Sequence, residues 1–365
     1  MKNKELTILI SVLAILIIIA GGVLGYKIIQ NKKNEKTEVS NPEVVEENKD
    51  ETIVINKKQP KIFNGTDRPI AVMIDNHSGA WPQANLNKAY IVYEIVVEGG
   101  ETRLMALFKC QDLEKIGPVR SSRHYFLDYA LENDAIYVHY GWSPQAQSDI
   151  STLGVNNING ITESSSSFWR IKDKTAPHNV LTSTEKILSI AERKRYQTTS
   201  NQKSVLNYVA DEFELQNAST QTNNTENNQT QEILDALTVT IPHSKLQTVK
   251  YEYNAETKTY TRYARGKLQK DYVTGEAITT KNIIITLCDN YDLADSEGKG
   301  RQGLSNIGTF DGYYITNGKA IKIKCTKTGR KEQTVYKDLH GNEINVNDGN
   351  TFINIAPTDA NITIE

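Results

Sequence analysis

The chain has 365 residues, and its 42 lysines and arginines against 44 aspartates and glutamates give a net charge of −2. This length is enough for about two domains, and the near-neutral balance lacks the basic footprint of a nucleic-acid-binding protein. The three cysteines, Cys110, Cys288 and Cys325, are too few and too scattered for a disulfide scaffold or a cysteine-rich zinc site. Cys288 and Cys325 both lie in the C-terminal half, and a disulfide between them stays open.

The N-terminus carries a long apolar segment, residues 6–29, with no charge before Lys27. It exceeds the roughly 20 residues that cross a bilayer and the core of a secretory signal peptide. The sequence therefore predicts a transmembrane signal-anchor over residues 1–29, with a single pass through the cell membrane and the bulk of the chain extracytoplasmic. The small residues at 19–22 would also permit cleavage of this apolar segment. No cysteine lies near it, so the sequence does not support a lipid-anchored start. Residues 30–58 are charged and lack a sustained period, which indicates a flexible stalk.

Residues 59–205 mix strand and helix patterns and predict an α+β or α/β domain. Mostly apolar stretches indicate strands at 68–76, 89–100, 102–108 and 135–141, and the glycine pair at 99–100 predicts a hairpin. Amphipathic stretches indicate helices over about 121–132, from near Ser143, and over 183–196 with Ser183 or Thr184 as N-cap.

Residues 217–232 are polar and of low complexity, typical of a linker or an insertion. Residues 235–365 alternate apolar and polar side chains between turns, which predicts a mainly β C-terminal domain. The fold expected is thus an α+β (or α/β) domain and a mainly β domain behind an N-terminal transmembrane helix.

The stretch GPVRSSRHY places Arg120, Ser121, Ser122 and Arg123 at the expected start of a helix. A helix N-terminus favours anions, and guanidinium groups suit carboxylates and phosphates. The alternative is that these arginines pair internally with the chain's own acids.

Glu94 and Glu98 lie four residues apart in an expected strand and would point to the same face. Two carboxylates on one face could serve as acid and base in glycan cleavage. They could equally bind Arg103, Arg120 or the backbone at a tight turn.

Asp75, His77, His139 and His178 fall near expected strand ends and turns, where functional side chains gather. Convergence of the four as metal ligands is conceivable, but no zinc-binding histidine motif occurs. No metal and no cofactor is therefore expected, and Glu98, Asp75 and His139 are the catalytic candidates should the protein be an enzyme, which stays uncertain.

The motifs RPIAVMIDNHSGAWPQANLNKAYIVYEIVVEGGETRLMALF, KIGPVRSSRHYFLDYALENDAIYVHYGWSPQA and APHNV resemble the N-terminal part of the YerB-like family of bacterial surface proteins. YTRYARGKLQKDYVTGEAITTKNIII and GYYITNGKAIKIKCTKTG resemble its C-terminal part more loosely. Two positions depart from the family pattern, because Ile323 and Phe352 stand where tryptophans are expected. A plain hydrophobic anchor also replaces the lipoprotein start of many relatives.

The resemblance implies a two-part ectodomain at the outer face of a bacterial membrane and supplies no reaction. We predict a membrane-anchored cell-envelope protein that binds an anionic or glycan wall ligand through its N-terminal domain. The alternatives are a wall glycan hydrolase or transferase with a Glu/Asp acid–base, and a scaffold for an envelope protein complex. The partner expected is thus a wall polymer or an envelope protein, not nucleic acid. The expected ligand-binding residues are Arg120, Ser121, Ser122, Arg123, Glu94, Arg103, Asn76 and His178.

Overall fold

The computed structural model describes residues 58–215, 231–294 and 297–365. The predicted transmembrane segment 1–29, the stalk up to residue 57 and nearly all of the polar segment 217–232 lie outside these residues. Within the described ranges, no helix is long and apolar enough to cross a membrane. Residues Lys57–Glu365 cluster into one compact unit.

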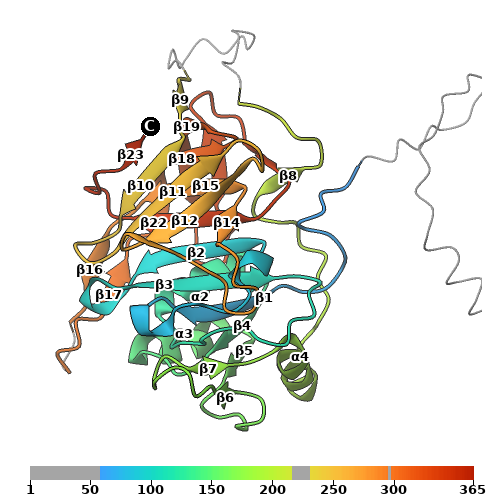
Figure 1. Ribbon diagram of the computed structural model, residues 1–365. Helices are drawn as coiled ribbons and strands as arrows, with labels where there is room; N and C mark the ends of the chain where they lie inside the picture. Colours follow the sequence, from blue (N-terminus) through green and yellow to red (C-terminus); the bar gives the residue numbers. More distant parts are fainter. Residues whose placement is uncertain (1–57, 216–230, 295–296) are drawn as a thin grey trace, which may run out of the picture. The chain divides into compact units, whose positions relative to one another are not determined.

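A large mixed sheet forms the centre of this unit (Figure 1). Its strands, in spatial order, are β20 (Val335–Asp338), β19 (Lys319–Lys327), β18 (Gly308–Thr316), β15 (Asn282–Leu287), β22 (Thr351–Ala356), β2 (Ile91–Val96), β3 (Thr102–Phe108), β1 (Ile70–Asp75), β4 (Ile136–His139) and β5 (Asn157–Asn159). An eleventh strand, β9 (Ile233–Asp235), pairs with β19. The C-terminal strand β22 lies between β2 and β15 and runs parallel to both, so the sheet continues through both halves of the chain.

A second, six-stranded sheet is built from the C-terminal half. It contains β13 (Lys267–Leu268), β12 (Thr259–Ala264), β11 (Thr248–Asn254), β10 (Thr238–Pro242), β23 (Thr363–Ile364) and, beside β12, β14 (Thr279–Thr280). The remaining strands of the described part of the chain form short pairs: β16 (Asn290–Asp292) with β17 (Gln302–Leu304), β8 (Asn207–Val209) with β21 (Asn345–Asn347), and β6 (Trp169–Arg170) with β7 (Val180–Leu181).

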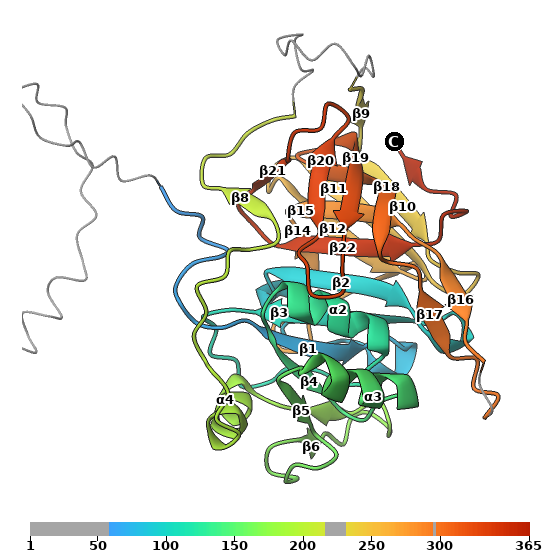
Figure 2. The ribbon, with the colours of Figure 1, turned by 180° about the vertical axis from the view of Figure 1, so that it is seen from behind.

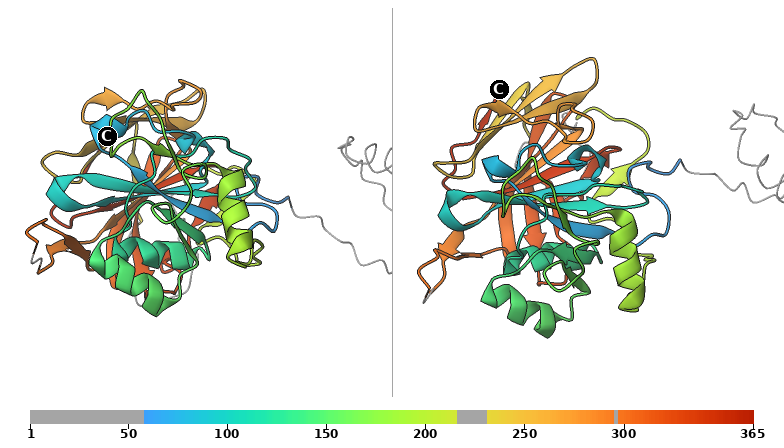
Figure 3. Two further views of the ribbon diagram at one scale, coloured as in Figure 1. Left: turned by 90° about the horizontal axis from the view of Figure 1, so that it is seen from below. Right: turned by 60° about the horizontal axis from the view of Figure 1, so that its bottom comes forward.

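The α-helices of the described residues are α2 (His124–Glu132), α3 (Pro144–Leu153) and α4 (Thr184–Arg193). The 3-10 turns there are η1 (Ser78–Ala80), η2 (Leu86–Lys88) and η3 (Glu98–Gly100). Helices α2 and α3 lie on one face of the central sheet and the second sheet lies on the other (Figures 2 and 3). The sequence alternation explains this layering, because successive side chains of a strand point to opposite faces. In β1, Val72 and Ile74 belong to the core shared with the second sheet, whereas Ala71 and Met73 belong to the core under α2.

The order of the chain agrees with the expected two parts, the first mixing helices with strands and the second mostly strands. The hairpin across the glycines is present as the antiparallel pair β2–β3. Ser143 and Ser183 cap α3 and α4 by accepting backbone hydrogen bonds. The boundaries 59–205 and 235–365 stay a prediction, since the central sheet runs through both parts.

Two local expectations were wrong. The helix expected from Ser121 begins at His124, with Arg123 as an N-cap residue that makes no side-chain capping bond. Glu98 does not lie in a strand with Glu94, because β2 ends at Val96 and Glu98 begins the turn η3, where Gly99 has a φ of 68°.

Cys288 and Cys325 are buried free thiols. Cys288 directly follows β15 and Cys325 lies on β19, and β18 separates these two strands. The Cα atoms of Cys288 and Cys325 are therefore separated by about two inter-strand spacings, roughly 9.6 Å. That exceeds the Cα separation that a disulfide spans.

Candidate functional site

The candidate site forms where β1 ends and β3 begins, beside the start of α2. Asp75 and Arg103 are register partners at these strand ends. The segment before α2 runs along β1, since Asp75 N–H donates to Pro118 O and Arg120 N–H donates to Met73 O, both at 2.8 Å. This backbone pairing carries the GPVRSSR stretch to the end of β1 and places Arg120 beside Asp75.

Asp75 is buried and is the centre of the site. Its Oδ2 lies 2.8 Å from Nδ1 of His178 and 3.2 Å from Nε of Arg120. Its Oδ1 accepts a hydrogen bond from the backbone N–H of His77 at 3.0 Å. A carboxylate with this many donors is held in one orientation.

His77 and His178 stack, with ring centroids 4.3 Å apart and planes 11° apart. His77 Nδ1 accepts a hydrogen bond from Gly79 N–H at 3.0 Å. A Cβ at Gly79 would lie 3.2 Å from both rings, so glycine gives the pair room. His178 comes from a loop that lies about 100 residues after Asp75 in the sequence.

Arg123 and Glu98 form a two-pronged ion pair, in which Arg123 Nε donates to Oε1 and Nη2 donates to Oε2 at 2.7 Å. Burial by itself would raise the pKa of Glu98, but the hydrogen bond and the charge of Arg123 outweigh it and lower this pKa. Glu98 is therefore ionised at neutral pH and unsuited to donate a proton. The internal-pairing alternative holds for Arg123.

Arg103 lies between the two ion pairs and is buried. Within the described chain, its one side-chain hydrogen bond runs from Nη1 to Ser121 O at 2.7 Å, although a guanidinium carries five N–H donors. Burial, then the nearby charges of Arg123 and Arg120, lower the pKa of Arg103 to about 10, against the opposing effects of Asp75 and Glu98. Around Arg103 the site thus holds three arginines, Arg103, Arg120 and Arg123, against the two carboxylates of Asp75 and Glu98.

Lys174 adds a further cation and was not expected from the sequence. Its Nζ donates to Ala80 O at 2.9 Å and also to Pro82 O. Burial lowers the pKa of Lys174 to about 8, while Asp173 and Asp75 oppose that shift. Nothing in the local pattern around residue 174 distinguishes it from a surface lysine, so only the fold reveals it.

The two serine hydroxyls bind groups of the protein other than the first turn of α2. Ser121 Oγ donates to Tyr140 O at 3.1 Å, and Ser122 Oγ accepts from Tyr137 O–H at 2.8 Å. Ser122 is fully buried, whereas Ser121 is partly exposed.

His139 does not join the site. It is fully buried, with Nδ1 2.8 Å from Gly141 O and Nε2 3.2 Å from the Asn157 side-chain oxygen. Burial lowers its pKa to about 4, so its ring is neutral in the folded protein at neutral pH.

Glu94 points to the opposite face of the sheet, away from Arg120. Its Oε2 lies 2.7 Å from Nη2 of Arg262 on β12, and neither side chain has any exposed surface. Its Oε1 accepts hydrogen bonds from Thr102 O–H at 2.7 Å and from Asn76 at 3.1 Å. Burial would raise the pKa of Glu94, but the charge of Arg262, His243 and the hydrogen bond from Thr102 lower it. Glu94 and Asn76 thus bind other side chains of this protein, at a place that a ligand does not reach in this conformation.

The sequence pattern of β12 indicated that Arg262 is buried and needs a partner. It occupies an inward position of β12 between buried Tyr260 and Ala264, and a charged residue at a core position calls for a buried partner. The partner itself could not be read from the sequence.

No group of three or more histidine, cysteine, aspartate or glutamate side chains suited to a metal ion occurs within residues 58–215, 231–294 and 297–365.

Residues 57–197 match the family model described as "Protein of unknown function (DUF3048) N-terminal domain", and residues 237–353 match the corresponding C-terminal domain model. The chain is 31% identical over 303 residues to "Putative lipoprotein YerB" of Bacillus subtilis (strain 168), covering 80% of this chain and 81% of that protein. The crystal structure of YerB from Bacillus subtilis matches with a TM-score of 0.70 at 30% identity, covering 84% of this chain and 97% of that one. The expected YerB-like resemblance is thus confirmed, and the chain belongs to the two-part DUF3048 family.

Proposed function

We propose that this protein is a membrane-anchored component of the cell envelope whose N-terminal part binds an anionic group of a wall polymer at Arg120. The relative's description as a lipoprotein supports an extracytoplasmic place. The apolar segment 6–29 supports a membrane anchor in this chain.

The observation that carries the ligand class is the charge of the site. Four cationic side chains, Arg103, Arg120, Arg123 and Lys174, face three carboxylates, those of Asp75, Glu98 and Asp173. The pKa of buried Arg103 is lowered by burial and then by its arginine neighbours. An anion would relieve that repulsion. Arg120 offers the contact, because its side chain is 27% exposed and its Nε lies 3.2 Å from Asp75 Oδ2. Its terminal N–H groups make no hydrogen bond to the described residues, so they can donate to a carboxylate or phosphate.

The test is co-sedimentation of residues 57–365, the compact unit, with purified cell-wall sacculi. We expect Arg120→Gln to weaken binding about tenfold or more, as for loss of a hydrogen bond to a charged group. Lys245→Gln removes one exposed positive charge elsewhere and should bind as the wild type does. The double variant Arg123→Met/Glu98→Leu removes the internal pair without changing the net charge.

Raising the salt concentration should weaken wild-type binding, because exposed charges are screened. Binding of Arg120→Gln at full strength with an unchanged salt dependence would show that this arginine only positions Asp75.

A second candidate, an envelope hydrolase, is favoured by one contact. The Asp75–His178 hydrogen bond of 2.8 Å through Nδ1 is the arrangement that orients an imidazole as a general base. Asp75→Asn should then abolish release of soluble fragments from sacculi while leaving sedimentation intact. If the wild type itself releases no fragments, binding without turnover is the better description.

A further inference from the structure

A separate pocket of about 690 Å³ lies at the other ends of β1 and β3. Ile70 and Phe108, which line it, are register partners, as are Asp75 and Arg103 at the charged site. Five residues of strand separate the two ends, or about 16 Å. Since Ile70 and Asp75 also point to opposite faces of the strand, the pocket and the charged site are distinct.

The floor of the pocket is apolar. Ile70 and Phe108 belong to the core, and Leu188 of α4 remains 38% exposed although it is a large apolar side chain. The Tyr196 ring also lines the pocket, and its hydroxyl donates to Asn157 O at 3.0 Å, which fixes the ring. A ligand with an apolar face would cover this surface.

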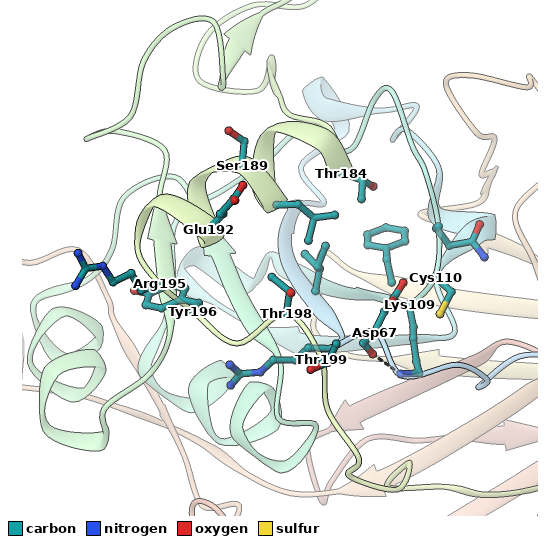
Figure 4. A pocket seen from close by; sticks show the side chains of 15 residues that line it. Asp67, Lys109, Cys110, Thr184, Ser189, Glu192, Arg195, Tyr196, Thr198 and Thr199 are labelled. Atoms are coloured by element: carbon teal, nitrogen blue, oxygen red, sulfur yellow. Dashed lines mark hydrogen bonds between the residues drawn. The ribbon is translucent and has the colours of Figure 1, made fainter. Parts of the chain in front are cut away.

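The wall of the pocket carries hydroxyl groups and the carboxylates of Glu192 and Asp67. Figure 4 shows Ser189 and Glu192 on α4, Thr198 and Thr199 on the segment that follows it, and Cys110 across from them. Within the described ranges of the chain, the side chains of Ser189, Glu192, Thr198 and Thr199 have no hydrogen-bond partner in the protein. They can therefore bind a ligand rich in hydroxyl groups.

The cations around the pocket are already engaged or directed elsewhere. Arg68 donates to Asp134 O, Asp134 Oδ1 and Gln197 O, and Lys109 donates to Asp67 O. The Arg195 side chain points away from the other lining residues (Figure 4). Of the two lining carboxylates, Asp67 interacts with the Cys110 thiol. Glu192 is therefore the carboxylate left as a charged acceptor, which favours an uncharged ligand with O–H or N–H donors.

We propose that this pocket binds one sugar unit of an uncharged glycan. The C–H face of a pyranose would pack on Phe108, Leu188 and Tyr196, while its hydroxyls would bind Glu192 and the threonine hydroxyls, the usual division of a small-molecule site into apolar walls and a few polar groups. The proposal goes beyond anion binding at Arg120 and does not rest on it.

Cys110 provides the readout. It lines the pocket and is exposed, whereas Cys288 and Cys325 are buried, so a maleimide should label it selectively in the folded full-length chain held in phospholipid nanodiscs. The probe is N,N′-diacetylchitobiose, an uncharged disaccharide. We expect it to slow labelling in a saturable manner, and calorimetric titration of the same pair measures binding even where the sugar leaves the thiol uncovered.

Thr198→Val and Glu192→Gln each remove one proposed hydrogen bond or its charge, and should weaken binding about 5- to 10-fold. Glu185 lies on the same helix but is exposed and paired with Lys186. Glu185→Gln should therefore leave binding unchanged. Arg120→Gln should also leave it unchanged, which separates this proposal from the anion site.

Absence of both saturable slowing and calorimetric binding at any soluble sugar concentration would overturn the proposal. So would tight binding of decanoate that Thr198→Val and Glu192→Gln do not alter, because that result identifies an acyl-chain site.

Discussion

Arg262 and Glu94 form an ion pair with no exposed side-chain surface, and further polar groups surround it. Arg262 Nη1 donates to Gln269 at 3.0 Å, and Asn354 lies 3.3 Å from His243 Nε2 and 3.4 Å from the Tyr251 hydroxyl. Burial would lower the pKa of Arg262, but Glu94 outweighs that effect and raises it. Both groups are therefore charged inside the core.

Removing one partner of this pair should cost far more than removing both. We expect Glu94→Leu or Arg262→Met alone to lower the free energy of unfolding by about 3–5 kcal/mol, because each leaves a buried charge unpaired. The double variant should lose less than either single variant. Urea unfolding of all four proteins measures this, and a double variant as unstable as the sum of the singles would contradict coupling.

The lowered pKa of His139 predicts that the protein loses stability in acid. Its pKa is about 4 in the folded protein and about 6.5 in an unfolded chain, so the unfolded state binds the proton first as the pH falls. The contribution is fully present above pH 6.5 and disappears between pH 6.5 and 4, at most about 3 kcal/mol.

The check is urea unfolding of the wild type and His139→Gln between pH 7.5 and 4. The variant should show a shallower pH dependence. Some slope of the same sign should remain, because burial also lowers the pKa values of His124 and His243. Identical slopes in the two proteins would show that His139 does not titrate as described.

At the scale of elements, Gly312 decides whether β18 can lie against β15. A Cβ at Gly312 would lie 2.2 Å from Ile285 O and 2.9 Å from Cys325 Sγ, and the first of these atoms is backbone in the centre of the sheet. Glycine is thus required by close approach of two strands rather than by backbone conformation.

Gly312→Ala should therefore destabilise the protein by about 3 kcal/mol or more. Gly266→Ala is the matched control, because Gly266 has a φ of +71° but a Cβ added there would meet nothing within 4 Å, and it should cost only about 1–2 kcal/mol. Thermal unfolding of both variants measures the difference. Equal losses would mean that the sheet shifts to accept the methyl group.

At the scale of the whole molecule, β22 joins the two parts of the chain into one sheet. It pairs with β2 of the first part along five residues and with β15 of the second part along six. Lys327 on β19 adds a buried ion pair with Glu132 on α2 at 2.8 Å.

We therefore expect residues 57–365 to unfold in one calorimetric transition. A fragment ending at residue 215 would expose one edge of β2 and leave Glu94 without Arg262, and should not fold cooperatively by itself. Two separate transitions, or a cooperatively folded fragment, would show that the parts are independent.

The sequence by itself determined the features that depend on near neighbours. The alternation of β1, the glycine-bearing hairpin between β2 and β3, and the serine caps of α3 and α4 all follow from side-chain period and capping chemistry within a few residues. The two-part order and the family motifs follow from composition and from residues that are adjacent in the chain.

Tertiary structure alone decided the partners of the charged residues. Glu94 pairs with Arg262, 168 residues away, whereas Glu98, four residues along, pairs with Arg123. Asp75 receives His178 from a distant loop, and the pocket beside Thr198 needs β1, β3 and α4 together. A periodic pattern fixes which face a side chain takes, but strand order and loop path determine what stands opposite, and those depend on contacts made across the whole chain.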